Sequence, residues 1–207
     1  MFTGLVQTVG RIEQVERRER GLRLVVQAAP IDSSSLKVGD SVAVNGCCLT
    51  AMKVEGTRFQ VDVSEQTLTT TANLDRCGDV NLELSLALGE RIGGHLMYGH
   101  VDAVGTVMNV SAVGESSELV VRAPRSLAAY LAYKGSLAVD GVSLTINRVE
   151  DSSAGCDVWI NLIPHTRAVT TLGQLAIGQS VNLEADPLAR YAERIASVLT
   201  PAHDKRT

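Results

Sequence analysis

Residues 39–50 read GDSVAVNGCCLT, and residues 134–145 read KGSLAVDGVSLT. Six of the twelve aligned positions are identical, and the offset is 136 − 41 = 95 throughout. One aligned position differs in chemistry, because Cys48 stands in the first stretch and Ser143 in the second. A chain that repeats a segment in this way is expected to use one fold twice.

The repeat extends along most of the chain. GLVQTVG at 4–10 aligns with GHVDAVG at 99–105, again at an offset of 99 − 4 = 95. Further matches pair VNLE at 80–83 with 181–184, and SEQTLTTT at 64–71 with IPHTRAVTT at 163–171. Two copies are fewer than the three or so that an open solenoid needs, so each copy should close on itself. We predict three parts of the chain: domains at 1–92 and 93–186, and a tail at 187–207.

Each half is expected to be all-β. The strand-like segments of the first half are rich in Val and bounded by Gly, Asp and Ser; they are 4–17, 22–29, 41–54, 58–63 and 80–88. Five or six short strands in roughly 90 residues predict a small antiparallel barrel, which has no exposed edge because it closes. Helical periodicity is weak; the exceptions are 124–133 and its short counterpart 30–36.

The tail begins with a predicted helix. Asp186 fits the N-cap and Pro187 the first helical position. An apolar stripe at three-to-four spacing follows, comprising Leu188, Tyr191, Ala192, Ile195, Val198 and Leu199. The stripe could pack on the chain's own barrels or pair with other copies, and the pattern favours neither. Residues 201–207 are expected to be disordered.

Composition narrows the classes of function. The 207 residues are 45% hydrophobic and 20% charged, and the net charge of −4 comes without a basic run, so nucleic-acid binding is not expected. The opening MFTGLVQTVG does not read as a signal peptide, and no apolar stretch approaches a membrane span, so we expect a cytoplasmic protein.

The cysteines do not suggest a metal site. Cys47 and Cys48 are adjacent in a strand-like run and should point to opposite faces. No C-x-x-C spacing occurs, and the histidines at 95, 100 and 165 do not form a metal motif. Cys47, Cys77 and Cys156 are expected to be small buried residues.

Several motifs, in this order and spacing, resemble the riboflavin synthases of the duplicated-barrel type. They are MFTG at 1–4, NGCCLT at 45–50, GGHLMYGHVD at 93–102, DGVSLT at 140–145, LIPHT at 162–166 and VNLEADPLARYAER at 181–194. The resemblance implies two six-stranded Greek-key barrels, a C-terminal helix and a homotrimer. It also implies a four-carbon transfer between two molecules of 6,7-dimethyl-8-ribityllumazine, without metal, nucleotide or redox cofactor, and a contact with lumazine synthase.

The resemblance also implies site residues. The catalytic positions would be Phe2, Ser41, Cys48, His100, Ser143, Thr145 and Asp186. The substrate-binding positions of the first copy would be Gly4, Leu5, Val6, Cys48, Leu49, Thr50, Asp62, Val63, Ser64, Gln66 and Thr67. Those of the second would be Gly99, His100, Val101, Lys134, Ser143, Leu144, Thr145, Asn161, Leu162, Ile163, Pro164, His165 and Thr166.

The reaction gives the duplication a physical reason. It consumes two copies of one substrate, one as donor and one as acceptor, so two similar but unlike sites are needed. The candidates for chemistry are therefore the positions where the copies differ, which pair Cys48 with Ser143, Leu5 with His100, and Gln66 with His165. Threonines that agree, Thr50 with Thr145 and Thr67 with Thr166, suit common hydrogen bonding to the ring.

Each candidate also has a structural interpretation. Phe2 could be a core plug, His100 a structural histidine, Lys134 a solvated charge, and Asp186 simply a helix cap. The sequence departs from the family pattern at Tyr98, Gln66, Leu84, Arg167 and Ala168. Two rival functions are a non-catalytic lumazine or flavin carrier and a structural trimer; the retained NG-x-x-LT and DG-x-x-LT loops favour the enzyme.

Overall fold

The two repeated stretches form the same hairpin in two different barrels. In the computed structural model, β3 (Ser41–Val44) turns into β4 (Cys47–Glu55), and β9 (Ser136–Val139) turns into β10 (Val142–Ser152). The turn residues Asn45 and Asp140 both have φ 45°, and the glycine after each has φ 79°. This left-handed pair is the two-residue turn that Asn-Gly and Asp-Gly favour. The single strand predicted at 41–54 is therefore wrong, since the turn divides it.

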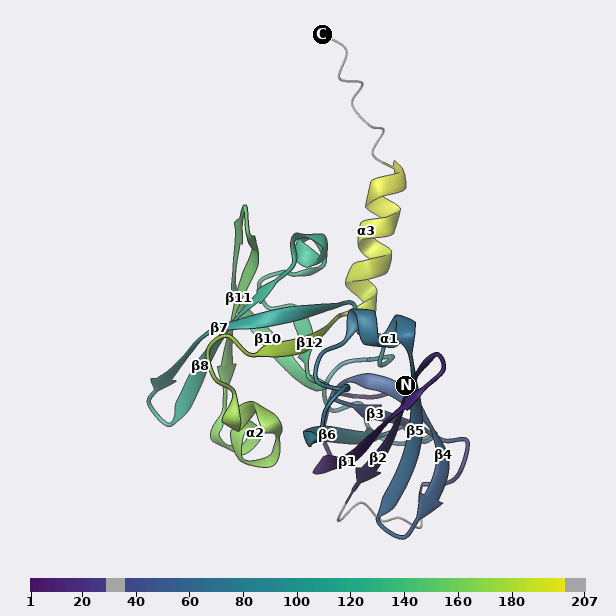
Figure 1. Cartoon of the computed structure of the whole chain (residues 1–207). Coiled ribbons are helices and arrows are strands. Elements are labelled where there is room, and N and C mark those ends of the chain that lie inside the picture. Colours follow the sequence, from purple (N-terminus) through teal and green to yellow (C-terminus); the bar gives the residue numbers. More distant parts are fainter. Residues whose placement is uncertain (29–35, 200–207) are drawn as a thin grey trace.

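The structure describes residues 1–28 and 36–199, and over these ranges the strands form two closed six-stranded antiparallel barrels (Figure 1). The first has the order β1-β2-β5-β4-β3-β6, and the second repeats it as β7-β8-β11-β10-β9-β12. This confirms the predicted fold. The remaining strands are β1 (Thr8–Arg18), β2 (Gly21–Gln27), β5 (Arg58–Ser64), β6 (Gly78–Leu84), β7 (Ala103–Val113), β8 (Ser116–Ala123), β11 (Gly155–Leu162) and β12 (Ser180–Ala185).

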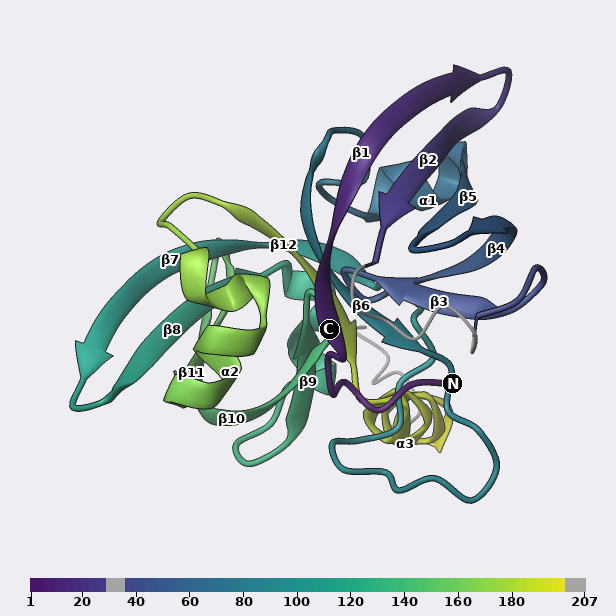
Figure 2. The ribbon, with the colours of Figure 1, turned by 90° about the horizontal axis from the view of Figure 1, so that it is seen from below.

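Short helices follow corresponding strands in the two copies. In the first copy α1 (Glu65–Thr70) comes after β5, and in the second α2 (Pro164–Val169) and the 3₁₀ helix η2 (Thr171–Gln174) come after β11 (Figure 2). The helix predicted at 124–133 is only the 3₁₀ turn η1 (Arg125–Tyr130), which Leu127 anchors in the second core. Most of its predicted counterpart at 30–36, and the tail at 201–207, lie outside the described residues.

The C-terminal helix α3 (Pro187–Leu199) stands away from both barrels (Figure 1). The Asp186 side chain accepts the Leu188 N–H at 2.9 Å, so the predicted N-cap forms. Only Pro187 is buried within the helix, and Arg190 pairs with Asp102 at 2.7 Å. The apolar stripe is left exposed, by 60% at Ile195 and 72% at Leu188.

The barrels meet along a polar seam that repeats the internal symmetry. Asn45 Oδ1 accepts the Asn81 N–H at 2.7 Å, and Asp140 Oδ1 accepts the Asn182 N–H at 2.8 Å. The two amide side chains then cross over, since Asn81 donates to the Asp140 carbonyl and Asn182 donates to the Asn45 carbonyl. These reciprocal bonds join the barrels by a pseudo-two-fold arrangement. Each half contributes the same elements to it.

Candidate active site

Two short arms cross between the barrels. The first arm, residues 2–6, pairs antiparallel with the second arm, residues 97–101, through Phe2 N–H to Met97 carbonyl at 2.8 Å and Met97 N–H to Phe2 carbonyl at 3.0 Å. Beyond this bridge each arm reaches the barrel of the other half. The Gly4 carbonyl accepts the Ser143 N–H at 2.9 Å, and the Gly99 carbonyl accepts the Cys48 N–H at 2.8 Å.

The side chains confirm that the arms are exchanged. Val6 packs against the core of the second barrel, and Val101 packs against the core of the first. His100 therefore follows the arm residue that bonds to Cys48, whereas its counterpart Leu5 follows the arm residue that bonds to Ser143. His100 belongs to the second copy in the sequence, so the repeat alone does not indicate this exchange.

A buried glutamate anchors each arm to its own barrel. Glu83 in β6 accepts the N–H groups of Thr3 at 2.7 Å and Gly4 at 2.9 Å. Glu184 in β12 accepts those of Tyr98 at 2.7 Å and Gly99 at 3.0 Å. Burial raises the pKa of both carboxyls, although these N–H bonds oppose it by favouring the charged form. Both residues belong to the VNLE repeat, but the repeat alone gave them no role.

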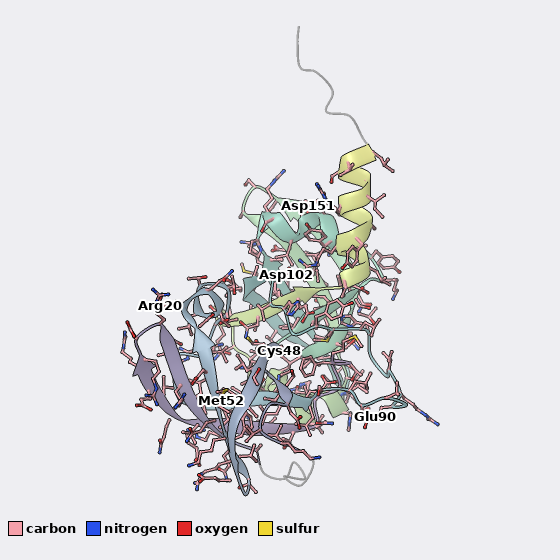
Figure 3. The ribbon with its side chains drawn as sticks, turned by 90° about the vertical axis from the view of Figure 1, so that its right-hand side faces the viewer. Arg20, Cys48, Met52, Glu90, Asp102 and Asp151 are labelled. Carbon is pink, nitrogen blue, oxygen red and sulfur yellow. The ribbon has the colours of Figure 1, made fainter. Side chains whose placement is uncertain are left out.

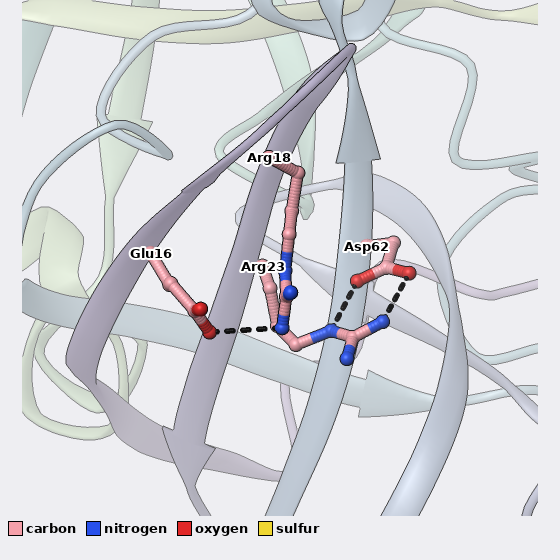
Figure 4. Close-up of polar contacts among 4 residues, drawn as sticks. All are labelled: Glu16, Arg18, Arg23 and Asp62. Atoms are coloured by element: carbon pink, nitrogen blue, oxygen red, sulfur yellow. Dashed lines mark hydrogen bonds and ion pairs between the residues drawn. The ribbon is translucent and has the colours of Figure 1, made fainter.

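The first candidate site lies on β4 and β5, where the second arm contacts Cys48 through the Gly99 carbonyl. Figure 3 marks the position of Cys48. Ser64 caps α1 by accepting the Thr67 N–H at 3.1 Å, which fixes two of the predicted binding residues. Arg23 holds Asp62 by two hydrogen bonds of 2.7 and 2.8 Å (Figure 4). The hydrogen bond from Arg23 lowers the pKa of Asp62, so this wall carries a fixed carboxylate.

The second candidate site has the same plan with different chemistry. Asn161 takes the place of Asp62 and faces Glu118 across the ladder, where the first site has Arg23. Ser143 replaces Cys48, and its Oγ lies 2.7 Å from Nδ1 of His95. His95 was not among the predicted site residues, although it stands in the GGHL motif.

Other predicted residues fall into groups by burial. Ser41 pairs with Thr50 and Thr145 with Ser136 on their ladders, and the two threonines are exposed. Four binding residues point into the barrel cores and leave only their backbones for a ligand: Leu49, Val63, Leu144 and Leu162. Those at the ends of the short helices are half-buried or exposed: Gln66, Ile163, Pro164, His165 and Thr166.

Three further predicted residues make packing or hydrogen-bonding contacts within the protein. Phe2 is fully buried with Ala43, Met97 and Ala138, so it plugs the seam between the barrels. Lys134 is exposed, and its Nζ lies 3.3 Å from the Asn147 side chain. Asp186 caps α3 close enough to His95 for its charge to act there.

The cysteines behave differently from one another. Cys47 is buried in the first core, and that burial raises the pKa of its thiol to about 12. Cys48 is half-buried at the seam, consistent with the opposite faces expected of neighbours in a strand. Cys156 is buried as predicted, but Cys77 is exposed and donates to the Glu13 carbonyl, so its predicted burial is wrong.

An open groove adjoins the first site. Its volume is about 610 Å³, and it joins Asp62, Val63 and Ser64 to the arginine-rich turn between β1 and β2. A larger hollow of about 850 Å³ lies on the other side of that turn, beside the loop 71–76. The groove contains three of the predicted binding residues and the larger hollow contains none, so we place the candidate site at the groove and the arms. The described ranges contain no cluster of three or more His, Cys, Asp or Glu suited to a metal, and none of their helices is long and apolar enough to cross a membrane.

Comparison with known families matches this duplicated architecture. The lumazine binding domain model matches the chain twice, at residues 3–85 and 98–186. The chain belongs to the lumazine-binding family. The two matches include residues 3–6 and 98–101 of the exchanged arms and the VNLE strands that anchor them.

Curated relatives in this family span the whole chain. A riboflavin synthase of Photobacterium phosphoreum is 39% identical over 100% of this chain and 94% of its own length. One of Mycobacterium bovis is 41% identical over 94% and 98%, and one of Bacillus subtilis is 34% identical over 100% and 94%. These enzymes place the chain among the riboflavin synthases of the family.

Solved structures of the protein LumP share the fold. LumP complexed with 6,7-dimethyl-8-(1'-D-ribityl) lumazine superimposes with a TM-score of 0.78 at 27% identity, covering 89% of this chain and 99% of LumP. LumP complexed with riboflavin gives a TM-score of 0.79 over the same shares. In LumP, this fold accommodates both ligands.

Proposed function

We propose that this enzyme is a riboflavin synthase, a transferase that moves a four-carbon unit between two 6,7-dimethyl-8-ribityllumazine molecules. The products are riboflavin and 5-amino-6-ribitylamino-uracil. One observation carries the proposal: the two barrels present the same arrangement of arm, hairpin and short helix, but at the matching position one has Cys48 and the other Ser143. Two similar barrels can each bind one lumazine molecule. Their different side chains let one lumazine act as the donor and the other as the acceptor.

The chemistry asks for positioning and modest acid–base help. Holding two ring systems face to face supplies about 7–11 kcal/mol of the barrier in well-aligned cases. Proton transfer at the ring's 7-methyl group adds about 10²–10⁴-fold. Cys48 is our candidate nucleophile in the first site, with His100 brought beside it by the second arm. No step requires a metal or redox group.

The productive pair of sites is proposed to form between chains. The buried cluster of Phe2, Ala43, Met97 and Ala138 packs at the bridge between the two arms. We propose that this cluster keeps the ligands at Cys48 and Ser143 of one chain apart. A first site of one chain facing a second site of its neighbour removes this obstacle.

The exposed stripe of α3 gives such neighbours a place to associate. Tyr191 is 62% exposed and Val198 63%. Within the described residues the main contact of their helix is with η1. We propose a homotrimer held by this stripe, in keeping with the family expectation. The cytoplasmic setting and the contact with lumazine synthase stay predictions.

The rival function is a carrier that binds lumazine without converting it. The likeness to LumP, which was solved in complex with a ribityl lumazine, is compatible with ligand binding by a carrier as well as by an enzyme. The enzyme is favoured because both sites carry polar groups: Cys48, Thr50 and Ser64 in one, and Ser143, Thr145 and Asn161 in the other.

Incubation with 6,7-dimethyl-8-ribityllumazine separates the two functions. We expect riboflavin fluorescence to grow without any added cofactor, with one riboflavin formed for every two lumazines consumed. A carrier would bind the compound and return it unchanged. Lumazine recovered intact after prolonged incubation with native protein would therefore reject the proposal.

A further inference from the structure

His95 is built into the second site by contacts on three sides. Its Nδ1 shares a hydrogen bond of 2.7 Å with Ser143 Oγ, and its backbone N–H donates to the Thr3 carbonyl at 3.2 Å. The preceding Gly94 packs so closely that a Cβ there would lie 2.8 Å from the Ser143 Cβ. Only 9% of His95 is exposed. The serine and the imidazole are therefore held together by the backbone around them.

The other ring nitrogen of His95 is free. Nε2 is buried, and no protein group in the described ranges hydrogen-bonds to it. A buried polar atom without a partner is costly, and each one in a native protein calls for an explanation, such as a catalytic role or a bound water. Here it belongs to a ring whose other nitrogen already holds a predicted catalytic hydroxyl.

Charge and burial act on the ring in opposite directions. Burial lowers the pKa of His95, while the nearby Asp186 carboxylate raises it to a smaller extent. The net effect favours a neutral imidazole, which offers one N–H and one lone pair. Such a ring can orient a hydroxyl without carrying charge into the site.

The pair is a feature of one copy only. Among the described residues, no histidine hydrogen-bonds to Cys48, the counterpart of Ser143. The two sites therefore differ in two ways: Cys48 stands in place of Ser143, and, in the part of the chain that the structure describes, only Ser143 is hydrogen-bonded to a histidine, His95.

We propose that His95 is a positioning residue of the second site, which fixes the direction of the Ser143 hydroxyl toward the bound lumazine. This inference rests on the proposed function. His95, which is not one of the predicted site residues, would orient the Ser143 hydroxyl for the reaction. Because the task is orientation, an amide that reaches the same point should perform it.

The test is a set of substitutions at His95 crossed with Ser143→Ala. In His95→Asn the amide reaches the place of Nδ1, whereas in His95→Gln it reaches the place of Nε2. We expect His95→Gln to lower kcat by about 10²-fold, the usual cost of a misplaced group, with little change in KM. His95→Asn should retain most of the parent's kcat. Circular dichroism and thermal unfolding would establish that each variant is folded.

The double variant distinguishes positioning from a structural role. If His95 acts through Ser143, His95→Gln should have little further effect on kcat once Ser143→Ala is present. Equal losses of kcat in His95→Asn and His95→Gln would overturn the inference. Additive losses of kcat in the double variant would overturn it too. In either case an active parent enzyme would leave the proposed function intact. An inactive parent would overturn both.

Discussion

Replacing Gly99 by alanine should open the first site by forcing the second arm away from Cys48. Gly99 has φ +73°, where an alanine costs about 1–2 kcal/mol. Its new Cβ would lie 2.5 Å from the Cys48 Cβ and 2.8 Å from the Cys48 nitrogen, and overpacking of this kind costs about 1–3 kcal/mol more. The total is about 2–5 kcal/mol, beyond what one backbone hydrogen bond from Cys48 to Gly99 can offset.

A matched control separates the clash from the backbone strain. Gly56 has φ +58°, and a Cβ added there would meet no atom within 4 Å, so Gly56→Ala should cost only the first part, about 1–2 kcal/mol. Urea unfolding would compare the free energies of the two variants, and lumazine titration would compare their binding. Gly99→Ala should be the less stable variant and should lose affinity at the first site. If the two variants unfold alike and bind lumazine alike, the arm does not pack on Cys48 as described.

Three further results are expected. Cys48→Ser should lower kcat far more than lumazine affinity in turnover and binding assays, whereas Cys47→Ser should leave kcat nearly unchanged; equal kcat in Cys48→Ser would make Cys48 structural. Burial raises the pKa of Asp140 from 3.8 to about 7. The stability that the protonated Asp140 side chain gives the fold is therefore complete below pH 3.8 and is lost as the pH rises through 7. Asp140→Asn places an asparagine at this turn, as Asn45 does in the first copy. In urea unfolding at pH 8 it should increase the free energy of unfolding by up to about 4 kcal/mol, from 3.2 pH units at 1.36 kcal/mol each, and by less at pH 5. An equal gain at both pH values would refute the raised pKa of Asp140. Ile195→Asp on the exposed stripe should give monomers by sedimentation with little turnover, and fully active monomers would place the whole site in one chain.

The sequence was sufficient for the duplicated barrels and the terminal helix because their signals are local. Alternating valines, an offset of 95 and the Asp186–Pro187 helix start each depend on residues near one another in the chain or on a constant spacing. The arm exchange is not local. The bond from Ser143 to Gly4 joins residues 139 positions apart, and an irregular arm of five residues has no periodicity that could indicate its partner. Repeat alignment therefore proposes Leu5 and His100 as counterparts but does not indicate that each arm contacts the barrel of the other half.

Other differences have similar causes. The Asn45–Gly46 turn was hidden inside an apolar run that read as one strand. Cys77 was expected to be buried from residue type alone, yet it lies in the loop before β6, where no core reaches it. His95 carried no signal of its own, because a histidine becomes informative only when its neighbour in space is known to be Ser143.

The claim that one chain carries two unlike lumazine sites can be tested by counting them. Equilibrium binding of 6,7-dimethyl-8-ribityllumazine to the Cys48→Ser variant avoids turnover during the measurement. The account predicts two lumazines per chain with different affinities, and one per chain when Gly99→Ala is added. A single lumazine per chain in Cys48→Ser, unchanged by Gly99→Ala, would contradict it.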